Sequence, residues 1–228
     1  MPAVRPPFHV LSGWGGAPSL LGPLTGGARS SLWRTTDGRV LRHTRASEPA
    51  LRWLLAVLML ARQAGIEAPV PIVRPSGALS CDGWTLEPFV EGRHPSSVAP
   101  IAPRVATLHR LTRRVPARPG HPALGDAGLP PPLRRLRGLL PRGPRCAIHG
   151  DLHPGNVLVG EGVVTLLDWE ETRRDDPAFD RAALGRNAPL LDLYEVAAGW
   201  RREPAHARRR ARALRTRLGG RPAPRARA

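Results

Sequence analysis

Residues 148–170 constrain the fold of this 228-residue chain more than any other stretch. Within them, residues 157–167 form two short apolar arms around Gly160-Glu161-Gly162, a pattern that is typical of a β-hairpin. Asn156 enters the first arm and Asp168 leaves the second. A hairpin with these arms therefore brings Asn156 and Asp168 together at its open end.

A third oxygen-bearing side chain belongs to the same end. Asp151 lies on a His-Gly-Asp turn just before the hairpin. Carboxylate and amide oxygens suit a hard cation such as Mg²⁺ that is held together with phosphates. We expect Asn156 and Asp168 to hold this cation, and the remaining carboxylate, Asp151, to accept a proton from a hydroxyl nucleophile.

The order and spacing of these residues resemble the catalytic loop and the metal-binding Asp of the protein-kinase-like fold. His-Gly-Asp-Leu-His-Pro-Gly-Asn at 149–156 and Leu-Asp-Trp-Glu at 167–170 are similar to the aminoglycoside phosphotransferase and choline kinase branch. The resemblance implies a two-lobed α+β fold, with a small antiparallel-sheet N-lobe and a mainly helical C-lobe. It also implies ATP and Mg²⁺ as cofactors, and transfer of the γ-phosphoryl group to a hydroxyl of an aminoglycoside, a sugar or an amino alcohol.

Three neighbours of the motif are expected to support it. His149 is expected to brace the loop, and His153 to contact phosphate or to pack. Asp180 resembles the structural Asp of the family, which accepts backbone N–H groups of the catalytic loop. Because Asp180 follows Asp168 so closely, the long activation segment of a protein kinase has no room here, and this indicates a small-molecule acceptor.

Residues 1–92 are expected to form the N-lobe. Residues 24–34 have the pattern of strand, glycine turn and strand, and the resemblance implies that Gly26 and Gly27 cover the nucleotide phosphates with backbone N–H groups. Residues 69–73 and 84–90 are expected to be further strands.

The segment from residue 86 to residue 92 resembles the hinge whose backbone binds adenine. This likeness assigns Glu87 and Phe89 to ATP binding and places the lobe boundary near Gly92.

Arg42 is expected on the third strand, where the family usually has the Lys that pairs with the phosphates. Arg binds phosphate as a fork, but it does not replace Lys freely in a tight site. The helix expected over residues 49–64 has no acidic residue in its interior, and Glu48 at its start meets the helix dipole instead. This altered pair favours the alternative of a catalytically weakened kinase-like protein that binds a nucleotide or a partner.

Residues 93–200 are expected to form the C-lobe, and residues 201–228 an Arg-rich, partly disordered helix or tail. Helices are expected over 102–113, 133–140 and 182–200, and a Pro- and Gly-rich loop over 116–132. The basic helix over 204–218 is expected to be a solvated end, followed by disorder in 219–228.

The net charge of +17 comes from Arg alone, because the chain contains no Lys. This indicates a composition bias more than selection for a basic surface. Eight of the eighteen acidic residues fall between residues 168 and 195, which favours local acidity at the cation site. The positive charge does not favour polycationic aminoglycosides as acceptors. No aromatic interleaving accompanies the Arg tail, so a nucleic-acid partner is not expected.

The cysteines and the apolar segments indicate where in the cell the protein is expected. Two cysteines give no disulfide framework, which is consistent with a reducing cytosol. The longest apolar run, at 54–61, is too short to cross a bilayer, so no membrane partner is expected. We therefore expect a cytoplasmic protein.

Two other classes stay open beside the kinase-like alternatives. In the first, His149, Asp151, His153 and Asp168 are the ligands of a zinc hydrolase. That hypothesis leaves the Pro-Gly-Asn sequence and the hairpin unexplained. In the second, the Arg tail binds nucleic acid through phosphate contacts, and binding falls steeply with salt.

Overall fold

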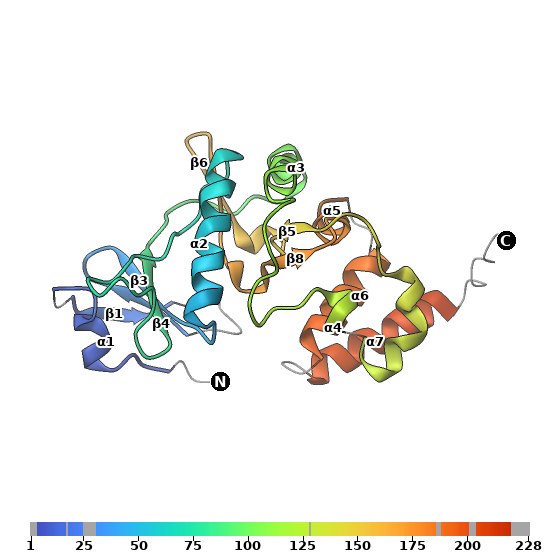
Figure 1. Cartoon of the computed structure of the whole chain (residues 1–228), viewed down its shortest axis with the longest axis horizontal. Helices are drawn as coiled ribbons and strands as arrows, with labels where there is room; N and C mark the ends of the chain where they lie inside the picture. Colours follow the sequence, from blue (N-terminus) through green and yellow to red (C-terminus); the bar gives the residue numbers. More distant parts are fainter. Residues whose placement is uncertain are drawn as a thin grey trace.

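The computed structural model describes residues 4–16, 18–24, 31–127, 129–185, 188–200 and 204–219. The N-terminal elements lie at one end of the molecule and the C-terminal helices at the other (Figure 1). The first elements are α1 (Phe8–Ser12), β1 (Leu20–Pro23), β2 (Leu32–Thr35), β3 (Arg39–His43), α2 (Glu48–Gln63), β4 (Trp84–Pro88), η1 (Ala99–Ile101), α3 (Ala102–Leu111) and α4 (Leu124–Ala127). They are followed by η2 (Pro131–Leu139), β5 (Cys146–Ile148), η3 (Pro154–Asn156), β6 (Val157–Gly160), β7 (Val163–Leu166), η4 (Trp169–Glu171), β8 (Arg173–Asp175), α5 (Ala178–Gly185), α6 (Ala188–Gly199) and α7 (Pro204–Gly219), where η marks a 3-10 helix.

The N-terminal part is built on an antiparallel sheet of order β1-β2-β3-β4. Successive side chains along its strands face opposite sides of the sheet. Leu41, Trp84 and Leu86 pack with α1 residues in one cluster, whereas Arg42 and Glu87 face the opposite side.

One strand prediction is wrong. Residues 69–73 are not a strand, although Ile72 donates its backbone N–H to the Leu86 carbonyl at 2.7 Å. Pro69 and Pro71 have no N–H to donate, so this segment is unable to continue a ladder.

Helix α2 confirms the helix expected over 49–64. Its buried side chains repeat at helical spacing, and Pro49 sits in its first turn. Those from Trp53 onward join a core cluster that also contains residues of α3, β5, β6 and β7. This core therefore connects the helix of the N-terminal part with the elements that carry the motif.

The β6–β7 hairpin is confirmed in the expected register. Val157 pairs with Leu166, and Gly160 pairs with Val163 across a turn in which Glu161 and Gly162 have φ values of 48° and 79°. Two segments from outside the hairpin pair with its strands, through bridges from Glu67 and Arg93. The boundary between lobes at Gly92 stays a prediction.

Helix α7 differs from the solvated end that the sequence favoured. Ala207, Ala211 and Leu214 are buried along one of its faces, against α6 and η2. Its Arg217 pairs with Asp192 at 2.5 Å, and its Arg210 pairs with Glu195. Residues 220–228, where disorder was expected, lie outside the described residues.

Two further segments are more structured than expected, or structured differently. Residues 133–140 were expected to be helical and lie mostly in the 3-10 helix η2, and the loop expected over 116–132 contains α4. Among the described residues, no helix combines the length and the apolar character that a membrane span requires.

Candidate active site

The turn before the hairpin is held by the carboxylate of Asp180. This side chain, in α5, is 1% exposed. Its Oδ2 accepts the backbone N–H of His149 at 2.9 Å and lies 2.8 Å from His109 Nε2, while Oδ1 accepts the N–H of Gly150 at 2.9 Å. Burial opposes ionisation of Asp180, but His109 and these backbone groups outweigh it and lower the pKa of the carboxyl group.

Gly150 is required by the shape of this turn. Its φ is 84°, a left-handed conformation that glycine adopts without strain. A Cβ atom here would lie 2.6 Å from Tyr194 Oη and 2.8 Å from the Glu171 carbonyl oxygen. The backbone at this point therefore packs too closely for any side chain.

His149 is buried and uses both ring nitrogens within the loop. Nε2 lies 2.9 Å from the Leu167 carbonyl oxygen, and Nδ1 accepts the N–H of Asp151 at 3.3 Å. Its ring packs against Trp169, with 4.8 Å between the ring centroids. Neither nitrogen is available to a metal ion. No group of three His, Cys, Asp or Glu residues in the described part of the chain could hold one, so these findings contradict the zinc hydrolase hypothesis.

Asp151 and Asn156 are joined directly. Asn156 Nδ2 donates to the Asp151 carbonyl oxygen at 2.9 Å and to Asp151 Oδ2 at 3.2 Å. Because the amide nitrogen makes these bonds, the atom that Asn156 offers to a cation is Oδ1. His153 Nε2 lies 4.0 Å from Asp151 Oδ2, while its Nδ1 accepts the N–H of Gly155 at 3.1 Å.

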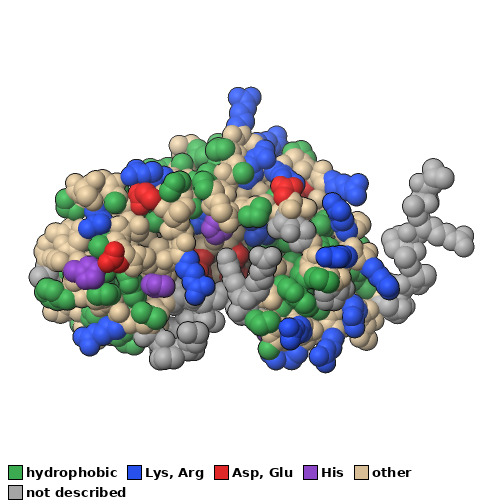
Figure 2. Space-filling view, turned by 60° about the horizontal axis from the view of Figure 1, so that its bottom comes forward, with side chains coloured by type: hydrophobic (Ala, Val, Ile, Leu, Met, Phe, Trp, Pro, Cys, Tyr) green, Lys and Arg blue, Asp and Glu red, His purple; other side chains and the backbone are tan. Residues whose placement is uncertain are grey.

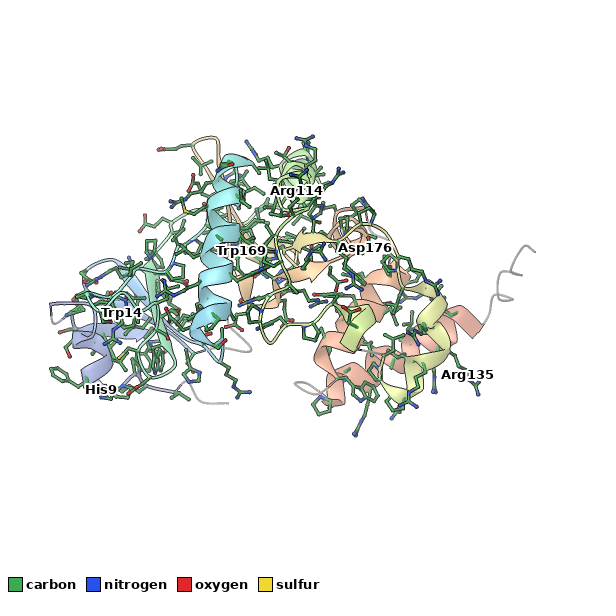
Figure 3. All side chains as sticks on the ribbon, viewed as in Figure 1. His9, Trp14, Arg114, Arg135, Trp169 and Asp176 are labelled. Carbon is green, nitrogen blue, oxygen red and sulfur yellow. The ribbon has the colours of Figure 1, made fainter. Side chains whose placement is uncertain are left out.

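Asp168 leaves β7 in a strained conformation. Leu167 donates its N–H to the Asn156 carbonyl oxygen at 2.9 Å, which places Asp168 directly beyond Asn156. The φ of Asp168 is 55°, a left-handed value that is unusual for a non-glycine residue and is often found at functional sites. Trp169, the next residue, anchors this turn in the core beside α2 (Figure 3).

Arg42 reaches this turn from the N-terminal sheet. Its Nη1 lies 3.5 Å from Asp168 Oδ1, and its Nε and Nη2 lie 3.0 and 2.9 Å from Glu87 Oε1. Burial opposes the positive charge, but the nearby carboxylates of Glu87 and Asp168 raise the pKa of Arg42, so it stays charged. Burial raises the pKa of Glu87, and Arg42 works against that rise.

The remaining predicted nucleotide contacts have different outcomes. Gly26 and Gly27 lie outside the described residues. Phe89 donates its backbone N–H to the Gly38 carbonyl oxygen at 3.0 Å, and its contact with ATP stays a prediction. Glu87 contributes its side chain to the Arg42 contact, whereas the hinge likeness pointed to its backbone.

Arg118 is a residue at the site that sequence reasoning missed. It lies in the expected loop but is 3% exposed. Its Nη1 donates to the carbonyl oxygens of Glu170 and Thr172 at 3.0 and 2.7 Å, and its guanidinium lies 5.8 Å from the ring centroid of Trp53 in α2. It therefore links α2 to the turn after Asp168. Nothing in a Pro- and Gly-rich segment marks such a contact.

The acidic stretch after Asp168 does not form one acidic surface. Asp175 pairs with Arg173 at 2.9 Å, Asp176 accepts the N–H of Gly143, and Asp192 pairs with α7. Figure 2 shows acidic side chains between the two ends of the molecule, and basic side chains over the C-terminal helices. The expected local acidity is thus largely used in internal contacts.

Comparisons with known proteins agree with the motif. The profile of the phosphotransferase enzyme family matches residues 127–222. A Bacillus subtilis (strain 168) protein described as uncharacterized, YcbJ, is 39% identical over 69 residues. That alignment covers 26% of this chain and 22% of YcbJ, so the chain spans less than a quarter of that relative.

Solved structures of similar fold extend over nearly the whole chain. A GDP and kanamycin complex of APH(2")-IIia has a TM-score of 0.59 at 14% identity, and the match covers 93% of this chain and 98% of that one. A choline/ethanolamine kinase family protein from Mesorhizobium loti has a TM-score of 0.54 at 18% identity, with coverages of 92% and 89%. The resemblance to these proteins and the two-lobed α+β protein-kinase-like fold are confirmed. The profile that matches residues 127–222 describes a phosphotransferase enzyme family, and the similar structures show the fold.

Proposed function

We propose that this protein transfers the γ-phosphoryl group of ATP to a hydroxyl group of a small molecule. The observation that supports this most is the linked set of Asp151, Asn156, Asp168 and Arg42. The carboxylate for the acceptor proton, the two oxygen donors for a cation and a charged guanidinium meet at the end of one hairpin. Catalysis of phosphoryl transfer consists mostly of such positioning and charge stabilisation.

Asp151 orients the acceptor hydroxyl and takes its proton. Its Oδ2 already accepts a hydrogen bond from Asn156, so we assign the proton to Oδ1. The side chain is 30% exposed, which leaves it open to an acceptor. His149 and Asp180 hold the loop backbone and so fix the direction of this carboxylate.

Asn156 and Asp168 fit Mg²⁺, because they offer an amide oxygen and a carboxylate oxygen at the same open end of the hairpin. The Asp168 side chain is 32% exposed, so a cation has access to it. When bound, Mg²⁺ would neutralise negative charge that develops on the phosphates. Arg42 directs Nη1 towards the same place, and Gly26 and Gly27 stay predicted as the turn that covers the phosphates.

The acceptor stays open among aminoglycosides, sugars and amino alcohols. Similar structures contain kanamycin or hygromycin B, and their nucleotides are GDP or AMP-PNP. The net charge of +17 disfavours a polycationic acceptor at long range. A cytoplasmic location also stays a prediction.

One observation favours a second candidate, a kinase-like protein that binds nucleotide but transfers slowly. Arg42 stands where the family usually has Lys, and it contacts Asp168 directly. In that case MgATP would bind without measurable transfer to any acceptor.

The test is a screen for phosphoryl transfer from ATP to a panel of hydroxyl compounds, with GTP as a second donor. Asp151→Asn should lower transfer by at least about 100-fold and leave MgATP affinity nearly unchanged. Asp126→Asn, an exposed residue of α4 paired with Arg145, is the matched control and should behave as the unchanged protein. If Asp151→Asn transfers as fast as the unchanged protein, the proposed role of Asp151 is wrong. Nucleotide binding with no transfer would select the second candidate.

A further inference from the structure

Glu87 is an acidic side chain buried in the N-terminal sheet, 9% exposed. A carboxylate in such a place is costly unless a cation and hydrogen bonds compensate for it. Here Arg42 compensates, with two nitrogens at 2.9 and 3.0 Å from the same oxygen. Arg42 is paired with Thr85 and Glu87 with Val40, so the two charged residues are diagonal neighbours on one face of β3 and β4.

The planar shape of the Arg42 side chain means that its contact with Glu87 also orients Nη1. The guanidinium is planar, so fixing the edge formed by Nε and Nη2 also fixes where Nη1 points. Glu87 holds that edge, and Nη1 then faces Asp168 Oδ1 at 3.5 Å. The side of Arg42 that remains for phosphate is therefore chosen by Glu87.

Helix α2 does not provide the acidic side chain that orients Arg42. It meets the small cavity beside Arg42, about 40 Å³ in volume, with apolar side chains, Leu51, Leu54 and Leu58. Its only acidic residue, Glu48, accepts the N–H of Leu79 at 3.0 Å and pairs with Arg52 at 3.1 Å. Glu87, on the neighbouring strand, is thus the acidic residue that pairs with the edge of Arg42 formed by Nε and Nη2.

We propose that Glu87 is the positioning residue of the nucleotide site, and that it keeps Arg42 available to phosphate while leaving Asp168 available to the cation. This inference rests on the proposed function. Without the charge of Glu87, more of the positive charge of Arg42 would be balanced by Asp168, and Arg42 would compete more strongly with Mg²⁺ for that carboxylate. Because β3 and β4 are adjacent strands in fixed register, the orientation of Arg42 does not depend on the placement of α2.

The main test is Glu87→Gln, which keeps an oxygen acceptor for Arg42 but removes the charge. The Mg²⁺ concentration for half-maximal ATP binding, measured by calorimetry, should rise about tenfold. ATP affinity without Mg²⁺ should not fall. The matched control is Glu67→Gln, which removes an exposed charge that pairs with Arg62 and should leave the midpoint unchanged. A purely structural role would lower thermal stability and leave the Mg²⁺ midpoint in place, and that result would overturn the proposal.

A second comparison covers the case in which Glu87→Gln does not fold. Replacing both partners of a buried ion pair with apolar residues is often tolerated, so Arg42→Met with Glu87→Leu should fold. In the Arg42→Met background, Glu87 has no guanidinium to position, and burial without a cation favours its protonated, neutral form. Adding Glu87→Leu should therefore shift the Mg²⁺ midpoint by less than about twofold. A larger shift would mean that Glu87 acts on the cation without Arg42, and would overturn the proposal.

Failure of the inference and failure of the proposed function give different results. If the unchanged protein binds no MgATP, the nucleotide site itself is wrong, and the role of Glu87 falls with it. If the unchanged protein binds MgATP and Glu87→Gln has the same Mg²⁺ midpoint, the inference alone is wrong.

Discussion

Replacing Asp180 by Asn should destabilise the protein strongly, because the fold of the catalytic turn depends on this carboxylate. Its two oxygens serve three donors, the N–H groups of His149 and Gly150 and the ring of His109. Asn has one oxygen, so its NH₂ group must face at least one of these donors. A hydrogen bond to a charged group contributes about 1.5–3 kcal/mol, and losing one or two of them predicts a loss of about 2–5 kcal/mol. That is a large part of the usual stability of a domain, about 5–15 kcal/mol.

Equilibrium unfolding in urea measures this loss as a lower midpoint concentration. Asp126→Asn is the matched control, since its exposed ion pair with Arg145 should contribute at most about 1 kcal/mol. A stability for Asp180→Asn within about 1 kcal/mol of the unchanged protein would refute the reasoning.

The same comparison has a defined pH dependence. The pKa of Asp180 is lower in the folded protein than in the unfolded chain, so the unfolded chain binds more protons at acid pH. The stability that this group contributes is present above its unfolded pKa and is lost as the pH falls through the folded pKa. The difference in free energy of unfolding between the unchanged protein and Asp180→Asn should therefore be largest at neutral pH and shrink below about pH 4.

Three further substitutions test other contacts. Gly150→Ala should abolish transfer and lower the urea midpoint, because its Cβ would collide with Tyr194 Oη, whereas Gly138→Ala, where a Cβ meets no atom within 4 Å, should change neither. Arg118→Met should weaken MgATP binding about tenfold or more in calorimetry, because three carbonyl oxygens of the turn after Asp168 lose their hydrogen bonds from Arg118. Ala211→Arg should lower the thermal midpoint by several degrees in a melting curve, because it places a charge in the buried face of α7; an unchanged midpoint would mean that α7 is a solvated end.

Local patterns predicted some of these features well. The hairpin followed from two apolar arms around a glycine turn, and helix α2 followed from apolar spacing with Pro49 in the first turn. In both cases the period of the side chains decides the structure. The strand prediction for residues 69–73 was wrong because it relied on their apolar character. Two prolines in this segment lack the N–H groups that a strand ladder needs.

Contacts between distant segments were beyond such patterns. The pairing of Arg42 with Glu87 depends on the register of β3 against β4, and residues 45 positions apart give no local signal of it. Arg118 depends on the path of an irregular segment, and the burial of α7 depends on α6 and η2. The motif therefore indicated which residues form the candidate site, and the tertiary structure was needed to find what holds Arg42 and the turn after Asp168.

Calorimetric titration of ATP into the protein, with and without Mg²⁺, tests the central claim most directly because it requires no knowledge of the acceptor. The unchanged protein should bind ATP in a Mg²⁺-dependent manner, and Asp168→Ala should remove that dependence. Asp126→Ala, in an exposed ion pair away from the motif, should keep it. Absence of ATP binding at millimolar concentration, or Mg²⁺ dependence that persists in Asp168→Ala, would contradict the account.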